Sequence, residues 1–303
     1  MSETAEPLWQ DDFSDRRKRI QDSLLRRRSI DRVTKVFTVL AVIALLYPLI
    51  DMILMFAYKG ATLISTTTFT QLTALNSATV TGGLQNAISG TVLLIALSSA
   101  ISVPLGVMGG IYLAEFSPRG RFSGIIRFVA DILAAVPSIV LGYAGLLFLV
   151  LYLGWGFSAL AGALTLSVFM FPYILRTTEL SLKNVPQSYR EAAMALGSSK
   201  TNMISRVTLR AALPGISTGI ILSMSIASGE TAQLLYTAGY SGFNPTALLH
   251  SPVGYLTYVV YVFSQLSFPT SQNLALVASF LLLVFVISLN VAARLLVRRM
   301  AKG

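Results

Sequence analysis

Cysteine is absent from the sequence, histidine occurs once, and charged residues make up only 12% of the chain. Without cysteine there is no disulfide framework and no thiolate nucleophile or metal ligand. The single histidine, His250, nearly excludes histidine-based metal sites and acid–base chemistry. Soluble domains contain about 25% charged residues, so this chain has about half the charge that a water-exposed surface needs. With 54% hydrophobic residues in 303 and a mean hydropathy of +0.70, it is predicted to be an all-α integral membrane protein.

The phosphate-binding loop of nucleotide hydrolases is also missing. No G-x-x-x-x-G-K-[ST] sequence occurs, so the chain cannot hold ATP phosphates by that route. We therefore expect no cofactor in this chain, no metal site and no enzymatic activity of its own. The main catalytic alternative, a membrane enzyme acting on lipid phosphates, needs a cluster of His, Asp or Ser at one interface, and the single histidine counts against it.

Six segments are apolar over enough residues to cross a membrane. A hydrocarbon core about 30 Å thick needs about 20 apolar residues in a helix. Such segments lie at about residues 33–57, 85–114, 125–153, 158–176, 216–240 and 273–297. The first is longer than the apolar stretch of a cleavable signal peptide, so we interpret it as an uncleaved span. The sequence therefore predicts a basic tail at 1–32 and a domain of six transmembrane helices at 33–300.

The basic residues predict the orientation of these spans. They fall in the tail, in the connections at 115–127 and 176–210, and after the last span, and only Lys59 falls on the opposite side. Because basic residues collect in cytoplasmic loops, both termini are predicted to lie in the cytoplasm, which gives an N-in/C-in protein of the plasma (inner) membrane. This asymmetry accounts for the net charge of +10 without a nucleic-acid partner.

A long connection, about residues 177–215, separates the fourth and fifth spans. Ser188 and Glu191 have the spacing of a capping box, which predicts a helix that begins at Tyr189. Gly197 is expected to end this helix, because glycine accepts the left-handed conformation that follows many helices.

After this turn, Ser198 or Ser199 is expected to cap a second helix that runs to about Leu213 and meets Pro214. A solvated hairpin with no role is a poor explanation for so long a connection. A helix-turn-helix that reads DNA is unusual in a membrane-tethered chain. We therefore expect a docking surface, on which small side chains at 192 and 193 let another protein approach closely.

The sequence Glu191-Ala192-Ala193, followed by Gly197, resembles the EAA loop of ABC-importer permeases. Val207 and Leu209 continue the family spacing, whereas Arg210 stands where the family has proline. The resemblance implies the architecture of a type I ABC-importer permease. In that family the loop forms a helix that docks on the ATPase subunit, so these four residues are candidates for ATPase coupling.

Six further stretches resemble the A-type permease subunit of the phosphate-specific importer: 82–91, 104–106, 112–115, 135–140, 176–179 and 229–238. The resemblance runs in the family's order over about residues 80–300. It implies import of inorganic phosphate through a pathway shared with a homologous second permease. It also implies two copies of an ATP-binding subunit, which hold the ATP, and an extracytoplasmic phosphate-binding protein.

Ionisable residues within the spans are candidates for the substrate pathway. A charged side chain in a span costs about 2.5–3.5 kcal/mol on insertion scales and is a functional hypothesis by default. Glu230 lies within the fifth predicted span and Asp131 within the third. By resemblance the pathway also includes Arg176, Glu179 and Thr231.

Glu230 is better suited to pair with an arginine that binds phosphate than to bind an anion itself. The resembling family usually has such an arginine one turn earlier, where this chain has Ile226. The partner is therefore an arginine of another chain, or Arg176, or the substrate is a different oxyanion such as sulfate, molybdate or tungstate. Ion-driven secondary transport is a further alternative, although the inverted repeats common in such proteins are not evident.

Overall fold

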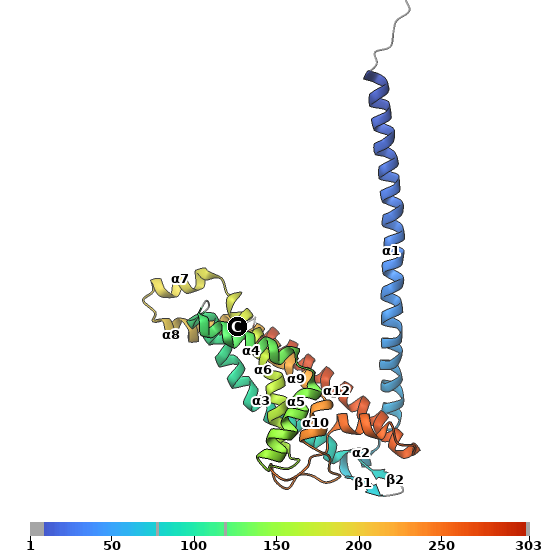
Figure 1. The fold of residues 1–303 in the computed structure, drawn as a ribbon, viewed down its shortest axis with the longest axis vertical. Coiled ribbons are helices and arrows are strands. Elements are labelled where there is room, and N and C mark those ends of the chain that lie inside the picture. Colours follow the sequence, from blue (N-terminus) through green and yellow to red (C-terminus); the bar gives the residue numbers. More distant parts are fainter. Residues whose placement is uncertain (1–8, 77–78, 118–119, 301–303) are drawn as a thin grey trace, which may run out of the picture. The chain divides into compact units, whose positions relative to one another are not determined.

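The computed structural model describes residues 9–76, 79–117 and 120–300. The chain divides into two compact units, residues 1–55 and 56–303, which we describe separately. The first unit is formed by the long helix α1 (Trp9–Thr62), whose last residues belong to the second unit (Figure 1). Residues Thr34–Thr62 of α1 are long and apolar enough to cross a membrane, which confirms the first predicted span.

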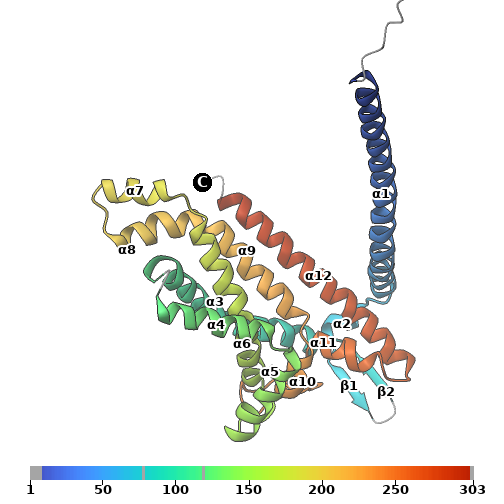
Figure 2. The ribbon, with the colours of Figure 1, turned by 45° about the horizontal axis from the view of Figure 1, so that its top comes forward.

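Four long helices form the centre of the second unit: α3 (Gln85–Ile111), α6 (Ala159–Lys183), α9 (Leu209–Ser228) and α12 (Pro269–Met300). Helix α6 packs against α3 and against α9, and α9 packs against α12 (Figure 2). A π-helical turn, η1 (Tyr112–Phe116), extends α3. Helices α3 and α12 confirm the second and sixth predicted spans, and α6 continues the fourth span beyond residue 176 to Lys183.

Glycines allow these helices to approach each other closely. A Cβ atom added at Gly110 of α3 would lie 2.5 Å from the Cβ of Thr178 on α6. On the α9 side, a Cβ atom at Gly219 would overlap the Thr177 side chain. Small residues take this role in membrane helices because packing, rather than water exclusion, drives their association.

The third predicted span, 125–153, is not one straight helix. Helix α4 (Arg121–Ala135) is followed by α5 (Ser138–Gly145) and the π-helical η2 (Leu146–Tyr152), and the two halves meet at 101°. Pro137 lies at the bend, and Val136 before it adopts an extended conformation, as residues that precede proline do. The described residues thus contain five helices that can each cross a membrane, or six spans if the bent pair counts as one.

Helix α7 (Gln187–Ala195) occupies the connection between α6 and α9. It begins directly after Pro186 rather than at Tyr189, and Ser188 lies inside it, so the predicted capping box is wrong. Pro186 ends the preceding segment and takes the cap position that the prediction gave to serine. Gly197 follows the helix with a φ of 77°, as predicted.

The next helix also differs from its prediction. It begins as α8 (Lys200–Asn202), where the Ser199 hydroxyl accepts a hydrogen bond from the Asn202 N–H, and continues through the π-helical η3 (Met203–Thr208) into α9. The predicted end near Leu213 is wrong, because Pro214 lies inside α9. Membrane helices tolerate proline where neighbouring groups compensate for the lost hydrogen bond.

Shorter elements close the opposite end of the second unit. Helix α2 (Thr66–Thr70) leads into strands β1 (Thr73–Asn76) and β2 (Thr79–Gly82), which pair antiparallel with Thr73 opposite Gly82. The buried Asn86 accepts hydrogen bonds from Thr73 and donates one to the Ser241 carbonyl oxygen. Helix α10 (Ala232–Thr237) packs against α5 and α6, and helix α11 (Leu256–Tyr258) and the π-helical η4 (Val259–Phe263) pack against α12.

Basic residues gather at one end of the second unit. Helices α7 and α8 and the C-terminal ends of α6 and α12 lie at one end, and the β-hairpin lies at the other (Figure 2). The first end has Lys183, Arg190, Lys200 and Arg294. For this unit, the structure thus agrees with the cytoplasmic side that the distribution of basic residues predicts.

Candidate functional site

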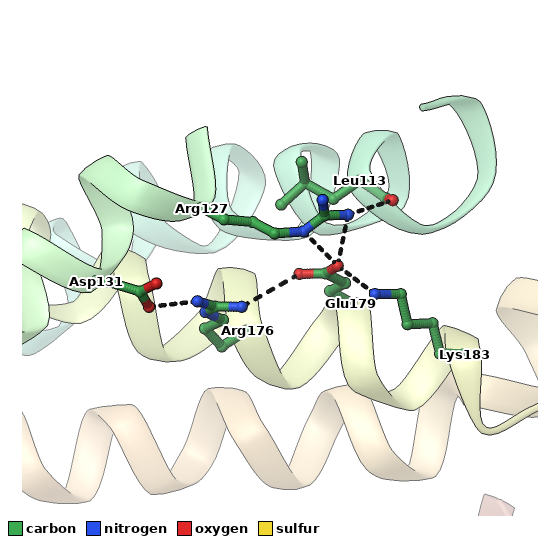
Figure 3. A network of polar contacts seen from close by, with 6 residues as sticks. All are labelled: Leu113, Arg127, Asp131, Arg176, Glu179 and Lys183. Carbon is green, nitrogen blue, oxygen red and sulfur yellow. Dashed lines mark hydrogen bonds and ion pairs between the residues drawn. The ribbon is translucent and has the colours of Figure 1, made fainter. Parts of the chain in front are cut away.

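A cluster of charged side chains surrounds Glu179 on α6 (Figure 3). The Glu179 side chain is only 4% exposed. Its Oε1 atom accepts hydrogen bonds from Arg127 Nε at 2.9 Å and from Lys183 Nζ at 2.6 Å, and Arg176 Nη1 lies 3.8 Å from its Oε2 atom. One buried carboxylate therefore faces three cations, which compensates the cost of removing it from water.

Arg127 joins three elements in this cluster. It lies on α4, binds Glu179 on α6, and donates a hydrogen bond at 3.1 Å to the Leu113 carbonyl oxygen in η1. Sequence reasoning counted Arg127 only as one more cytoplasmic charge. One feature of the sequence could have indicated that Arg127 belongs to the cluster. Arg127 and Asp131 are four residues apart on α4, so they share a face of that helix.

Arg176 lies between two carboxylates of different exposure. It contacts the buried Glu179 on its own helix and forms a hydrogen-bonded ion pair with Asp131 of α4 (Figure 3). The side chains of Arg176 and Asp131 are 42% and 58% exposed on the surface of this chain. The guanidinium is fixed in position yet remains accessible, and a planar guanidinium can donate two hydrogen bonds to an oxyanion.

Glu230 lies in a break between helices rather than inside the continuous span predicted over 216–240. Helix α9 ends at Ser228, Gly229 follows, and α10 starts at Ala232. The Glu230 N–H donates to the Ala227 carbonyl oxygen, which closes the last turn. A flexible glycine and a β-branched threonine after the helix favour this ending over further helix.

The Glu230 carboxylate lies next to Ser138, the first residue of α5. The N-terminus of a helix carries a partial positive charge, so it favours a carboxylate at this position. Within the described residues Glu230 forms no ion pair, and Arg176 is held in the Glu179 cluster instead. The hypothesis that Arg176 is the partner of Glu230 therefore has no support in this structure. Thr231 follows Glu230 in the chain and is the cap residue before α10.

The candidate coupling residues lie on and after α7. Glu191 and Ala192 are exposed, together with Met194 and Leu196, whereas Ala193 is only 8% exposed and packs against η3. Of the two alanines, only Ala192 can therefore meet another protein directly. Gly197 makes the turn to α8 in open surroundings, with no atom near the position of an added Cβ.

Sequence reasoning also missed a buried ion pair that links α7 to η1. Arg190 Nη2 lies 2.7 Å from Glu115 Oε1, and these side chains are 15% and 6% exposed. The partners are 75 residues apart in the sequence, so no local spacing indicates them. The only signal was the position of both residues on the predicted cytoplasmic side.

The long helices, the bent pair and the exposed cytoplasmic helix are features of a membrane permease. The chain belongs to the family described as binding-protein-dependent transport system inner membrane component, whose model matches residues 106–302. It is a multi-pass membrane protein of this family, and its relatives are transport permeases rather than enzymes.

Within the family, the chain groups with phosphate transport system permease proteins. It is 46% identical to PstA 2 of Mycobacterium bovis over 71% of each chain, and 39% identical to PstA of Yersinia pestis over 89% of this chain and 90% of that protein. The fold is also that of the solved MetNI methionine ABC transporter in inward-facing conformations, with a TM-score of 0.58 and 19% identity over 72% of this chain and 97% of that one. The predicted family and fold class are thus confirmed.

Proposed function

We propose that this chain is a permease subunit of an ATP-driven importer of inorganic phosphate. The observation that carries the proposal is its similarity to proteins named phosphate transport system permease over most of both chains. The accessible guanidinium of Arg176, a residue of α6, supports it, because bidentate hydrogen bonds suit a phosphate oxyanion.

The substrate pathway in this proposal includes Arg176, Glu179, Glu230 and Thr231. Arg176 supplies the hydrogen-bond donors, and Glu179 orients it from the buried side. Glu230 and Thr231 lie at a helix break next to the N-terminus of α5. Broken helices whose N-termini face the site are a recurrent way for transporters to hold anionic groups.

Energy comes from partner chains in this proposal. Two copies of an ATP-binding subunit hold the ATP, and each permease receives one on the exposed face of α7, where Glu191 and Ala192 lie. A homologous second permease completes the pathway, and an extracytoplasmic phosphate-binding protein delivers the substrate to the end near the β-hairpin. Closure of the ATPase dimer then drives a two-state change of the spans around the site.

Uptake by cells tests the proposal. Cells that lack this chain and have no redundant transporter should lose uptake of labelled phosphate, and restoring the chain should recover it. Excess sulfate or molybdate should leave the recovered uptake unchanged. Normal phosphate uptake in the deleted strain would contradict phosphate as the substrate and leave the permease architecture intact.

A further inference from the structure

The π-helical turn η1 is held on one side by α4. Tyr112 packs edge-on against Phe122, with ring centroids 6.1 Å apart. The Leu113 carbonyl oxygen accepts a hydrogen bond from Arg127, and the Leu113 side chain is fully buried in a cluster that includes Ala130. Two consecutive residues of η1 therefore attach it to the first half of the bent pair.

The next residues of η1 are held by the helices of the cytoplasmic connection. Glu115 binds Arg190 of α7 at 2.7 Å, and both side chains are largely buried. The Lys200 ammonium, at the start of α8, lies 5.0 Å from the centroid of the Phe116 ring. The same short turn thus contacts α4 through its first residues and α7 and α8 through its last.

Arg190 has two further acceptors besides Glu115. Its guanidinium donates to the carbonyl oxygens of Leu182 and Val185, each at 2.8 Å, at the C-terminal end of α6. Carbonyl groups in the last turn of a helix have no partner within the helix, and a cation there also interacts favourably with the helix dipole. Arg190 therefore joins α7, η1 and the end of α6 with three charge-assisted hydrogen bonds.

Apolar contacts close the remaining space under α7. Ala193, on the inner face, packs in a cluster with Met203 and Ile204 of η3, and Ile111 at the end of α3 packs against this cluster. A tilt of α7 relative to α3 would therefore break the Arg190 hydrogen bonds and open this cluster at the same time. Closely packed interiors move as units rather than deform continuously.

We propose that the Arg190–Glu115 ion pair makes α7 and η1 one rigid body, which passes a displacement of α7 through η1 to α4 and the bend at Pro137. Arg190 is a positioning residue in this mechanism, and the pair stays intact throughout the transport cycle. The inference rests on the proposed function, because it takes α7 as the surface on which the ATP-binding subunit docks.

The first test uses the complete transporter in proteoliposomes, with Glu115→Gln and Arg190→Gln as variants. We expect the ATP-binding subunit to co-purify in unchanged amount and ATP hydrolysis to persist, while phosphate uptake per ATP falls about tenfold. Arg206→Gln is the matched control, since Arg206 is exposed and forms no ion pair within the described residues. Unchanged uptake per ATP in both variants would overturn the linkage.

The second test uses the absence of cysteine from this chain. A Glu115→Cys/Arg190→Cys double variant, assembled with partner subunits that have no reactive cysteine, is treated with a short bifunctional thiol reagent. Cross-linking should restore uptake per ATP above that of the untreated variant, because it replaces one rigid connection with another. Loss of the residual uptake on cross-linking would show that the two residues must separate, which would overturn the proposal.

The same measurements separate this inference from the proposed function. If no ATP-binding subunit co-purifies with the unaltered chain, the docking surface itself is wrong and the linkage falls with it. If the subunit co-purifies with every variant and uptake per ATP stays constant, only the linkage is wrong.

Discussion

The guanidinium of Arg127 lies 2.9 Å from the carboxylate of Glu179 and thereby holds α4 against α6. This contact joins the first half of the bent pair to α6, the most buried of the candidate membrane spans. Because Glu179 also binds Lys183 and faces Arg176, this one carboxylate contacts three cations of the cluster.

Removal of the Glu179 charge should therefore destabilise the protein strongly. Glu179→Gln leaves Arg127 largely buried without its carboxylate, and breaking such a pair costs about 3–5 kcal/mol. Thermal unfolding of the purified protein in detergent measures this effect. Lys183→Gln is the control, because Lys183 is 48% exposed and its loss should cost about 1 kcal/mol or less. Equal unfolding temperatures for the two variants would contradict the central place of Glu179.

Glu191→Lys should impair transport while the protein still assembles in the membrane. The residue is exposed on α7, so the change should leave membrane assembly intact while it alters the surface proposed for ATPase docking. We expect phosphate uptake in cells to fall about tenfold or more, with the amount of chain in the membrane unchanged. Uptake equal to that of the unaltered chain would remove Glu191 from the docking surface.

Glu230→Gln should impair transport more than folding. Glutamine keeps the shape and polarity of the side chain but removes the negative charge at the N-terminus of α5, so the cost to stability should be about 1 kcal/mol or less. Uptake at saturating phosphate and the amount of protein in the membrane are measured together. If the protein instead fails to accumulate, Glu230 has a structural role and not a transport role.

Gly219→Ala should weaken the contact between α9 and α6. The added Cβ atom overlaps the Thr177 side chain, and overpacking of this kind costs about 1–3 kcal/mol. Gly124→Ala on α4 is the matched control, because no atom lies within 4 Å of the added Cβ and alanine favours the helix. Thermal unfolding should therefore show a lower midpoint for the Gly219 variant and an unchanged or higher one for the Gly124 variant.

Hydropathy predicted most of the spans because membrane helices need long apolar segments, and α3 and α12 match their predicted ranges closely. Both breaks lie in segments predicted as single spans: proline can kink a helix at Pro137, but the apolar composition continues through Pro137 and past Gly229. Apolar length alone cannot distinguish a straight span from one bent by 101°.

Within the candidate site, only the contact between residues close together in the sequence could be predicted. The relation between Arg176 and Glu179 follows from helical spacing, and the structure has them 3.8 Å apart. The partners of Arg127 and Arg190 lie 52 and 75 residues away in the sequence. Such contacts depend on how α3, α4 and α6 pack, which a single sequence does not specify.

The most direct test of the account is transport by the purified complex. The chain is reconstituted in proteoliposomes with its second permease, the ATP-binding subunits and the binding protein, and accumulation of labelled phosphate is measured with ATP on the cytoplasmic side. The account predicts uptake that requires ATP, is lost with Glu191→Lys, and is unaffected by excess sulfate or molybdate. ATP-dependent uptake of another oxyanion, with none of phosphate, would contradict it.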